Sequence, residues 1–535
     1  MARINRGIRI SIRDEIESSS VVVPTCTCPV HLSFLASAPG AVIVSFKTPI
    51  SITFPRLHHS RNDVIADPRR LTDKRSSDGR PCTHKNQIQG SVHNSGLDWI
   101  LPPGNGRSNL PAWVVMVKGI PHDRNEKKSL PKESLIALFH EPIRNKPVLV
   151  VSAVVASLAI AVTSTHLFVA SPIDPVEYQL PSPPHFEEEL ATNTRLAKAE
   201  LLLEDQVYGP ECIAVDQKSG RAYTGLKTGL ICEIDYSGKE AKILRAVRLT
   251  SLEGCDGSYQ SMIKCGRPLG MRIHPQSKEL YVLDAYLGLF AINWDTEKVR
   301  QFFTSGTSIS DDDSAAPTRY LNDFDFLPDG RLVISESSTK FDDRDFIYDL
   351  LEHRPNGRLL AYDLEKEELS VMIDNLYFPN GVEVVRGKVF IAEMGKARIL
   401  KYSPSSNTIN VLNDNLPGYP DNIRQTSNGE LWVPIAAMRS DGDNWLAARP
   451  TLRALLTKQF FVLQLLSSQG VQAVAEWMTR KYGLVLKMDV ESGKILESLH
   501  DSTGRVSDIT TAVEDGHGHL LIGSDANYYL AKLKL

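Results

Sequence analysis

The sequence lacks the excess of basic residues that nucleic-acid-binding proteins usually carry. Its 60 Lys and Arg residues stand against 64 Asp and Glu residues, so the formal net charge is −4, and this balance argues against a nucleic-acid partner. The seven cysteines include no CxxC motif matched by a second one, which argues against a zinc ribbon. The sequence also has no Asn-x-Ser/Thr sequon, so natural N-glycosylation cannot report on which side of a membrane the chain lies.

One long apolar run interrupts this ordinary composition. Residues 148–170 read VLVVSAVVASLAIAVTSTHLFVA and contain no formally charged side chain. About 20 apolar residues cross the roughly 30 Å hydrocarbon core of a bilayer as a helix, and a buried core helix is seldom apolar on every side for so long. The sequence therefore predicts a transmembrane signal-anchor helix over residues 147–170, which lies too far along the chain to be a cleavable signal peptide.

The charges that flank this run predict its orientation. Basic residues precede it and acidic residues follow it, namely Lys127, Lys128, Lys132, Arg144 and Lys146 before it and Asp174, Glu177, Glu187, Glu188 and Glu189 after it. Because basic residues stay on the cytoplasmic side, we expect a single-pass type II protein with its C-terminal part lumenal or extracellular. The membrane is then that of the endoplasmic reticulum, the secretory pathway or the cell surface.

The parts on either side of the run differ in character. Residues 1–146 are rich in Ser, Arg, Pro and Asn and are expected to be a disordered cytoplasmic tail, or else an extension of the gene model. Residues 171–194 are acidic and rich in proline, as in a stalk. Residues 191–207 have helical character and lead into a main domain expected over residues 195–535.

The main domain repeats one pattern of short strands and polar turns. Each unit opens with a short turn followed by an alternating strand, and the openings are residues 208–216, 266–274, 319–327, 377–385, 418–426 and, less clearly, 505–513. Six such units predict an all-β fold, a six-bladed β-propeller. Between the fifth and sixth openings, apolar residues recur at helical spacing over residues 445–483, which predicts a helical insertion that covers one face of the propeller as a lid.

Aligning the six openings brings one residue of each unit into register. These residues are Glu211, Leu269, Asn322, Asn380, Asp421 and, with a less clear alignment, Asp508. Because the innermost strand of each blade lines the central channel, we expect these side chains to meet around the axis. Carboxylate and amide oxygens suit Ca²⁺, whereas Zn²⁺ would favour His or Cys. Any one Pro-Asn-Gly or Pro-Asp-Asn would be an ordinary turn, so the prediction depends on the coincidence.

Several motifs around these positions resemble a known family. They are GPECIAVD, CGRPLGMRIHP, LNDFDFLPDGRLVISESSTKF, YDLLEHRPNGRLLAYD, FPNGVEV and GYPDNI. From about Val148 to the C-terminus, the chain resembles the strictosidine synthase-like and adipocyte plasma membrane-associated branch of the calcium-dependent propeller hydrolases. The wider superfamily includes paraoxonases, gluconolactonases and diisopropylfluorophosphatase.

The resemblance implies roles for particular residues. Glu211, Asn322, Asn380 and Asp421 match the catalytic calcium ligands of the superfamily, and Asn422 follows Asp421 as it does in paraoxonases. The resemblance also implies a disulfide between Cys255 and Cys265, which would persist on the oxidising side of a membrane, and a buried free thiol at Cys212.

Two departures from the family pattern leave the activity open. Leu269 stands where paraoxonases carry a histidine, and Asp508 lies near the point where true strictosidine synthase uses a glutamate, so alkaloid condensation is not expected. What the resemblance implies is calcium-dependent hydrolysis of a small ester or lactone, with Asp421 or Asp508 as base or nucleophile. The alternative is a non-catalytic surface propeller that acts in adhesion, signalling or membrane-protein trafficking.

Overall fold

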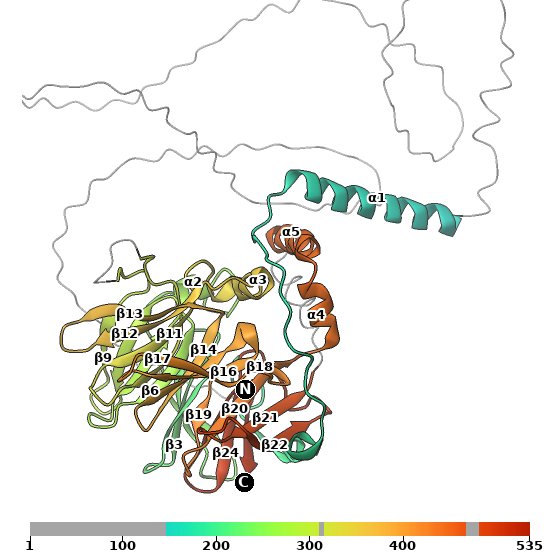
Figure 1. Cartoon of the computed structure of the whole chain (residues 1–535). Helices are drawn as coiled ribbons and strands as arrows, with labels where there is room; N and C mark the ends of the chain where they lie inside the picture. Colours follow the sequence, from blue (N-terminus) through green and yellow to red (C-terminus); the bar gives the residue numbers. More distant parts are fainter. Residues whose placement is uncertain (1–145, 310–314, 467–480) are drawn as a thin grey trace, which may run out of the picture. The chain divides into compact units, whose positions relative to one another are not determined.

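The main part of the chain is a six-bladed β-propeller, as predicted (Figure 1). The structure is a computed structural model and describes residues 146–309, 315–466 and 481–535. The expected cytoplasmic tail lies outside the described residues, as does the segment 467–480 of the expected helical insertion. Six antiparallel sheets, one for each blade, follow one another in chain order.

The first three blades each contain four consecutive strands. Blade one contains β2 (Ile213–Asp216), β3 (Arg221–Gly225), β4 (Leu230–Asp235) and β5 (Lys242–Arg248). Blade two contains β6 (Pro268–Ile273), β7 (Leu280–Asp284), β8 (Gly288–Asn293) and β9 (Lys298–Phe303). Blade three contains β10 (Tyr320–Phe326), β11 (Leu332–Ser338), β12 (Gly357–Asp363) and β13 (Glu368–Leu376).

The remaining blades include one interruption and one non-local strand. Blade four contains β14 (Pro379–Val385), β15 (Lys388–Glu393), β16 (Arg398–Ser403) and β17 (Thr408–Asn413). Blade five contains β18 (Gly418–Pro420), β19 (Arg424–Gln425), β20 (Leu431–Met438), β21 (Gly483–Met488) and β22 (Ile495–Asp501). Blade six contains β23 (Ile509–Glu514), β24 (His519–Ser524) and β25 (Leu530–Lys534), and its outer strand is β1 (Glu200–Leu202), which closes the ring.

Burial explains why the strands of one blade differ in sequence. The second strands are buried along almost their whole length, as in β11, whereas the outermost strand β5 alternates between exposed and half-buried residues. A strand covered on both faces needs a continuous apolar run, and an edge strand needs only one apolar face. Six clusters of buried side chains, one between each pair of neighbouring blades, form the core.

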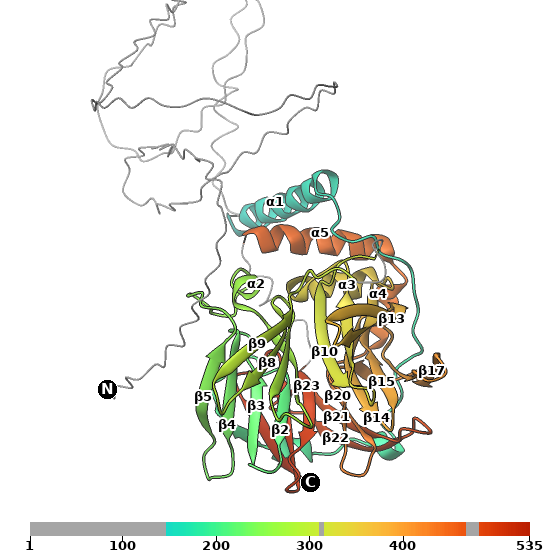
Figure 2. The ribbon, with the colours of Figure 1, turned by 90° about the vertical axis from the view of Figure 1, so that its left-hand side faces the viewer.

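Helices occur mainly at one end of the propeller. They are α2 (Met262–Cys265), α3 (Phe346–Glu352), α4 (Asp441–Ala447) and α5 (Pro450–Leu466), with short 3-10 turns at Glu188–Leu190, Leu196–Lys198, Asp343–Asp345 and Met394–Lys396. Figure 2 shows α2, α3 and α5 at the same end of the blades. The helices α4 and α5 belong to the expected insertion, which lies inside blade five between β20 and β21.

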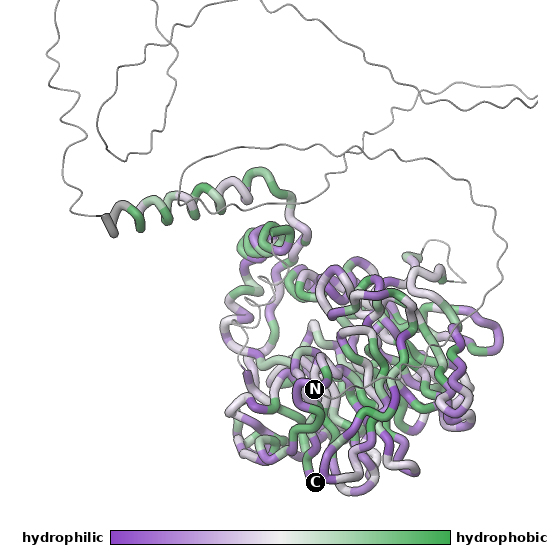
Figure 3. Tube along the Cα trace, turned by 180° about the vertical axis from the view of Figure 1, so that it is seen from behind, coloured by the Kyte–Doolittle hydropathy of each residue, from purple (hydrophilic) through white to green (hydrophobic). Residues whose placement is uncertain are grey.

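The chain reaches the propeller through α1 (Lys146–Phe168). Its segment Val150–Phe168 is long and apolar enough to cross a membrane, by length and composition, and Figure 3 shows α1 as a run of mostly green residues. The expected stalk does not stand free, because Ile173, Leu180 and Leu190 are buried against the propeller. The helix expected over residues 191–207 is wrong: this stretch contains a 3-10 turn and then β1, whose pairing with β25 outweighs the local helical spacing.

The loop that precedes β6 is closed covalently. Cys255 and Cys265 form a disulfide with an S–S distance of 2.02 Å, as the resemblance implied. Among the described cysteines, Cys212 and Cys232 are free and buried.

Candidate functional site

Every predicted ring position from blade two to blade five lies at an irregularity of an inner strand. The β10 ladder shifts register between Leu321 and Phe324, around Asn322, and the β14 ladder shifts between Pro379 and Val382, around Asn380. In blade five the chain leaves β18 before Asp421 and pairs again at β19. Such bulges turn a side chain out of the normal alternation and are common beside functional sites.

Hydrogen bonds bring the first, fifth and sixth blades together at this level. The Nδ2 of Asn422 donates to Oε1 of Glu211 at 2.6 Å. The backbone N–H of Asn422 donates to the carbonyl of Thr510 at 2.9 Å, and the hydroxyl of Thr510 donates to the carbonyl of Glu211 at 2.6 Å. Two of the predicted ligand residues, Glu211 and Asn422, are therefore in direct contact.

The fourth blade approaches the fifth through a glycine. A Cβ added to Gly381 would lie 2.5 Å from both the carbonyl oxygen of Asp421 and the backbone nitrogen of Ile423. Only glycine permits this approach, so Asn380, next to Gly381, lies beside the segment that carries Asp421.

Two serines of β11 connect the third blade to the fourth. The hydroxyl of Ser337 accepts from Nδ2 of Asn322 at 3.0 Å and donates to the carbonyl of Pro379 at 2.8 Å. The hydroxyl of Ser335 donates to the carbonyl of Asn380. Asn322 and Asn380 are thus held side by side, and the contacts from blade three to blade six run continuously around the channel.

Five buried oxygen atoms of this ring have no hydrogen-bond partner among the residues that the structure describes. They are Oε2 of Glu211 and the Oδ1 atoms of Asn322, Asn380, Asp421 and Asn422. An unsatisfied buried oxygen is costly, and five of them at one level of the channel form a set of hard donors of the kind that Ca²⁺ takes. The predicted ligands therefore fit a calcium ion by their chemistry.

The two carboxyl groups of the ring are strongly perturbed. Burial raises the pKa of Glu211 to about 8, against the opposing charge of Arg267. Burial and the nearby charge of Glu211 raise the pKa of Asp421 well above its usual range. A bound divalent cation reverses this effect, because it stabilises the ionised carboxylates. Among the described residues, no group of three or more His, Cys, Asp or Glu side chains is arranged to hold a metal ion, so the candidate centre depends on the asparagine oxygens.

A second polar layer lies one to three residues further along the inner strands. Asp323 pairs with Arg424 at 2.8 Å and with Arg272 at 3.3 Å, and Arg272 also reaches Glu383 at 3.1 Å. Burial opposes ionisation of Asp323, but Arg272 and Arg424 outweigh it and hold its pKa below the usual value. The free thiol of Cys212 accepts a hydrogen bond from Arg424 at 3.0 Å.

Sequence reasoning missed this layer, although a signal was present. Arg272, Glu383 and Arg424 each lie three residues after the aligned position of their own opening. Charged residues at one offset in otherwise apolar strands indicate a second ring, and Asp325 completes the pattern three residues after Asn322.

An apolar cluster lies next to the ring. Leu269, Ala285, Tyr320, Phe378 and Met394 are buried together, and Leu269 is the residue that replaces the histidine of paraoxonases. The hydroxyl of Tyr320 donates to Asp343 at 2.9 Å. The cluster can contact an aromatic or aliphatic group but offers no imidazole.

The structure separates the two predicted catalytic residues. Asp421 belongs to the ring, whereas the carboxylate of Asp508 accepts from Lys481 at 2.6 Å. The register shift of β23 falls between Ile509 and Thr511, so Thr510, and not Asp508, occupies the position in register. Asp525, which sequence reasoning did not single out, is an electrostatic neighbour of Glu211 and Asp421.

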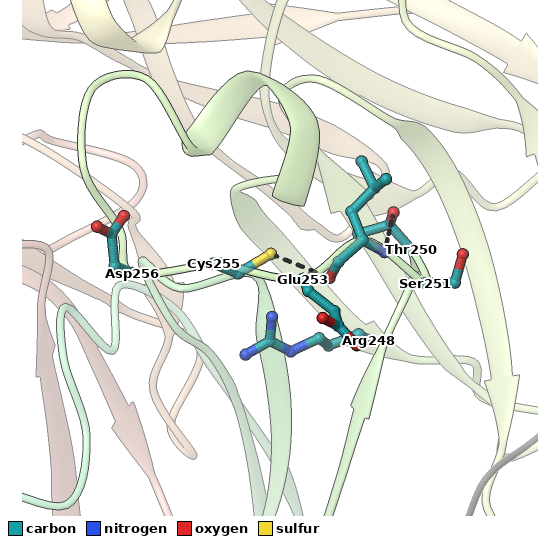
Figure 4. A pocket seen from close by; sticks show the side chains of 8 residues that line it. Arg248, Thr250, Ser251, Glu253, Cys255 and Asp256 are labelled. Atoms are coloured by element: carbon teal, nitrogen blue, oxygen red, sulfur yellow. Dashed lines mark hydrogen bonds between the residues drawn. The ribbon is translucent and has the colours of Figure 1, made fainter. Parts of the chain in front are cut away.

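A separate surface hollow of about 610 Å³ lies in the loop between β5 and α2 (Figure 4). It is lined by Arg248, Thr250, Ser251, Leu252, Glu253, Gly254, Cys255 and Asp256. None of the ring residues takes part, and the hollow is lined only by its own loop, so we assign no chemistry to it.

Two family models match the chain. The model described as strictosidine synthase matches residues 322–407, and the model described as strictosidine synthase-like, N-terminal, matches residues 189–234. The first contains Asn322 and Asn380, and the second contains Glu211.

Individual relatives match a large share of the chain. Adipocyte plasma membrane-associated protein from Salmo salar is 34% identical over 375 residues, which is 68% of this chain and 85% of the relative. The Homo sapiens protein of that name is 32% identical and covers 71% of this chain and 88% of the relative. Strictosidine synthase-like 13 from Arabidopsis thaliana is 29% identical and covers 56% of this chain and 74% of the relative. A solved gluconolactonase from Xanthomonas campestris is 14% identical, with a TM-score of 0.41, and covers 68% of this chain and 98% of that chain.

Proposed function

Because the chain belongs to the strictosidine synthase-like family, together with the adipocyte plasma membrane-associated proteins, we propose that it is a membrane-anchored, calcium-dependent hydrolase of aryl esters or lactones. The observation that carries this proposal is the set of five buried oxygens, contributed by four blades, that have no hydrogen-bond partner in the described part of the chain. Ester hydrolysis generates negative charge on oxygen, and a site built from hard oxygen donors for a cation suits that chemistry.

Five side chains would hold the ion, and one of them would also act on the substrate. Glu211, Asn322, Asn380, Asp421 and Asn422 would hold Ca²⁺, which supplies Lewis-acid polarisation of the ester or lactone carbonyl when bound. We assign the base to Asp421, a ring carboxylate that a bound cation would keep ionised and so able to accept a proton from an attacking water. Asp508 is the weaker candidate, because its carboxylate is engaged by Lys481.

The neighbouring side chains account for binding and positioning. Tyr320, Phe378 and Met394 lie in the apolar cluster beside the ring and suit an aromatic or acyl group. Asn422 fixes Glu211 through its 2.6 Å hydrogen bond. This arrangement favours an apolar ester or lactone over a highly charged substrate.

The anchoring part of the proposal concerns α1. We propose that α1 crosses the membrane with the N-terminus in the cytoplasm and the propeller on the lumenal or extracellular side. The apolar length of Val150–Phe168 supports the anchor, and the Cys255–Cys265 disulfide supports an oxidising compartment for the propeller.

The alternative is a propeller that binds calcium without catalysis. Leu269 takes the place of the histidine, and the cluster that contains it is buried. In that case calcium would stabilise the fold, and the surface would serve adhesion, signalling or trafficking.

One set of measurements tests these alternatives on the purified full chain in lipid nanodiscs. We expect hydrolysis of phenyl acetate or an aromatic lactone that disappears with chelator and returns with Ca²⁺. We also expect Ca²⁺ to raise the melting temperature, because an ion at 100 times its Kd stabilises the folded protein by about 2.7 kcal/mol. Asn380→Ala should lower kcat/KM by about 100-fold or more, as expected when a preorganised polar group is removed. The matched control is Asn428→Ala, in the exposed hairpin turn before β20, which should change neither quantity.

The outcomes separate the candidates. A melting shift that Asn380→Ala abolishes, without turnover of any ester, supports the non-catalytic propeller. The absence of any effect of Ca²⁺ on melting or turnover would remove the ring from both functions.

A further inference from the structure

The helix α5 differs from an ordinary surface helix in the kind of side chain that it buries. Its two fully buried residues, Arg453 and Thr457, are polar. The guanidinium of Arg453 donates to the carbonyls of Leu351 and Val176, and to that of Ala447 at 3.1 Å. A surface helix of a soluble protein normally turns its apolar stripe toward the core, whereas the fully buried positions of α5 are polar.

The polar stripe continues along the helix and defines the outward face. Gln464, eleven residues after Arg453, accepts from the hydroxyl of Tyr348 at 2.8 Å and donates to Asp345 at 3.3 Å. At 3.6 residues per turn, the opposite side carries Leu455, Val462 and Leu466. Leu455 and Val462 are half-buried, and Leu466 is 79% exposed. The same side also carries Thr451, Lys458 and Gln459, and the end of α1 contacts it, because Lys458 donates to the carbonyl of His166 at 3.1 Å. The outward face of α5 therefore combines apolar side chains with polar and basic ones.

The neighbouring helix α3 extends the apolar surface. Its Phe346 and Ile347 are each 40% exposed, and the Tyr348–Gln464 hydrogen bond fixes α3 to α5. Trp445 of α4, just before α5, is 54% exposed, and tryptophan is enriched where a protein meets the headgroup region of a bilayer. Exposed apolar residues that gather in this way mark a contact with a partner or a membrane.

The chain fixes how far this surface can lie from the end of α1. Ile173 is buried with Phe341 and Tyr348, and Phe460 of α5 packs on the same cluster. The backbone N–H of Asp174 donates to Oε1 of Glu352, at the end of α3, at 2.7 Å. Only five residue steps separate Ile173 from Phe168, the last residue of α1, and they span at most about 17 Å when fully extended.

From these observations we propose that α5 and α3 rest on the bilayer that α1 crosses, with Leu455, Val462, Leu466, Phe346 and Ile347 in its interfacial region. The inference depends on the proposed membrane anchor, because the short tether brings the surface to lipid only if α1 is inserted. An amphipathic helix that lies in the interface binds through such an apolar face.

The proposed contact of α5 and α3 with the bilayer determines which end of the propeller faces the membrane. The helix α2 ends at Cys265 and β6 begins at Pro268, so Leu269 and the other ring positions lie at the end of the blades that carries the helices (Figure 2). The candidate site then lies at the end of the propeller that faces the bilayer, so we expect its substrates to be lipophilic esters or lactones partitioned in the membrane.

Depth-dependent quenching tests the contact in the full chain. In a background in which Cys26, Cys28 and Cys82 are replaced by Ser, single cysteines from Leu466→Cys and Phe346→Cys are labelled with an environment-sensitive fluorophore. The protein is reconstituted into phosphatidylcholine–phosphatidylserine vesicles that contain nitroxide lipids labelled near the headgroup. We expect both labels to lose most of their fluorescence, whereas a label at Ile409→Cys, exposed on β17 near the opposite end of blade four, keeps it.

A label at Leu158→Cys within α1 distinguishes failure of the bilayer contact from failure of the membrane anchor. If nitroxides deep in the acyl chain quench the Leu158 label but neither nitroxide quenches the Leu466 and Phe346 labels, the bilayer contact is overturned and the anchor stands. If the Leu158 label is not quenched, the anchor itself fails and the contact with it. Equal quenching at Ile409 would also overturn the proposal, because the contact would then be unspecific.

Discussion

Asp323 lies at the centre of the buried ion pairs beside the ring. Its carboxylate is fully buried and pairs with both Arg272 and Arg424. Asp323→Ala leaves two buried guanidinium groups without their shared partner, so we expect the free energy of unfolding to fall by about 3–5 kcal/mol. Chemical denaturation of the purified protein measures this loss.

The control for this prediction is an ion pair at the surface. Asp329 pairs with Arg331 at 2.7 Å, and their side chains are 51% and 38% exposed. Asp329→Ala should cost less than about 1 kcal/mol. Similar losses for the two variants would mean that burial does not decide the strength of the inner network.

The ring residues show how far the site could be predicted from the sequence. Glu211, Asn322, Asn380 and Asp421 could be aligned because Pro, or Leu at residue 321, precedes them in a similar turn. The last opening has no such marker, so the alignment chose Asp508, two residues before the position that the structure gives to Thr510. Local spacing fixes a register only where each repeat carries its own turn residue.

At the scale of single elements, the end of α3 holds the entering chain and is sensitive to pH. His353 is buried, and its ring stacks on Tyr178 with 3.3 Å between the ring centroids. Burial lowers its pKa to about 3, and the charges of Lys396 and Arg453 act in the same direction. Tyr377 also packs against the His353 ring, with 5.0 Å between the ring centroids, and none of these contacting side chains is acidic.

The sign of the pH effect follows from this shift. The folded protein keeps His353 neutral, whereas the unfolded chain takes up a proton below a pH of about 6.5. The free energy of unfolding should therefore fall by roughly 2 kcal/mol between pH 6.5 and pH 5 on account of this residue. Denaturation at pH 7 and pH 5 measures the loss, and His353→Phe, which keeps the ring but cannot be protonated, should lose less stability over this interval. Equal losses in the two proteins would contradict the assignment.

Elements were predictable to different degrees for a physical reason. The second strands, such as Lys388–Glu393, combine β-branched and apolar residues between turns and could be recognised locally. The strand β1 has only three residues, and its identity depends on pairing with β25 more than three hundred residues away. No local pattern encodes such a partner, which is why residues 191–207, which contain β1, were expected to be helical.

On the scale of the whole molecule, closure of the ring and attachment to a membrane involve the same stretch of chain. The segment after α1 is buried at Ile173, Leu180 and Leu190, and then supplies β1 to blade six. Blade six thus combines β1, which follows the proposed anchor, with β23, β24 and β25 from the end of the chain. It cannot form until these last three strands have been synthesised. Orientation in the membrane is the part that the sequence predicts only through flanking charge.

A single engineered sequon can decide this orientation. Asn407 lies in the exposed turn between β16 and β17, and Ile409→Thr creates an Asn-Thr-Thr sequon there. If the propeller is lumenal, the variant expressed in cells should gain a glycan, seen as a gel shift that an endoglycosidase removes. Ile409 is 44% exposed on an outer strand, so the substitution should leave the fold unchanged.

The matched control places a sequon on the other side of α1. Gly96→Thr creates an Asn-Ser-Thr sequon at Asn94 in the N-terminal region, which lies outside the described residues. A cytoplasmic N-terminus leaves this site unmodified, because glycosyl transfer takes place in the lumen. The type II orientation therefore requires modification at Asn407 together with none at Asn94, and the reverse pattern would place the candidate calcium ring in the cytoplasm. Cytosolic calcium is far scarcer than lumenal calcium, so that result would also weaken the proposed calcium-dependent activity.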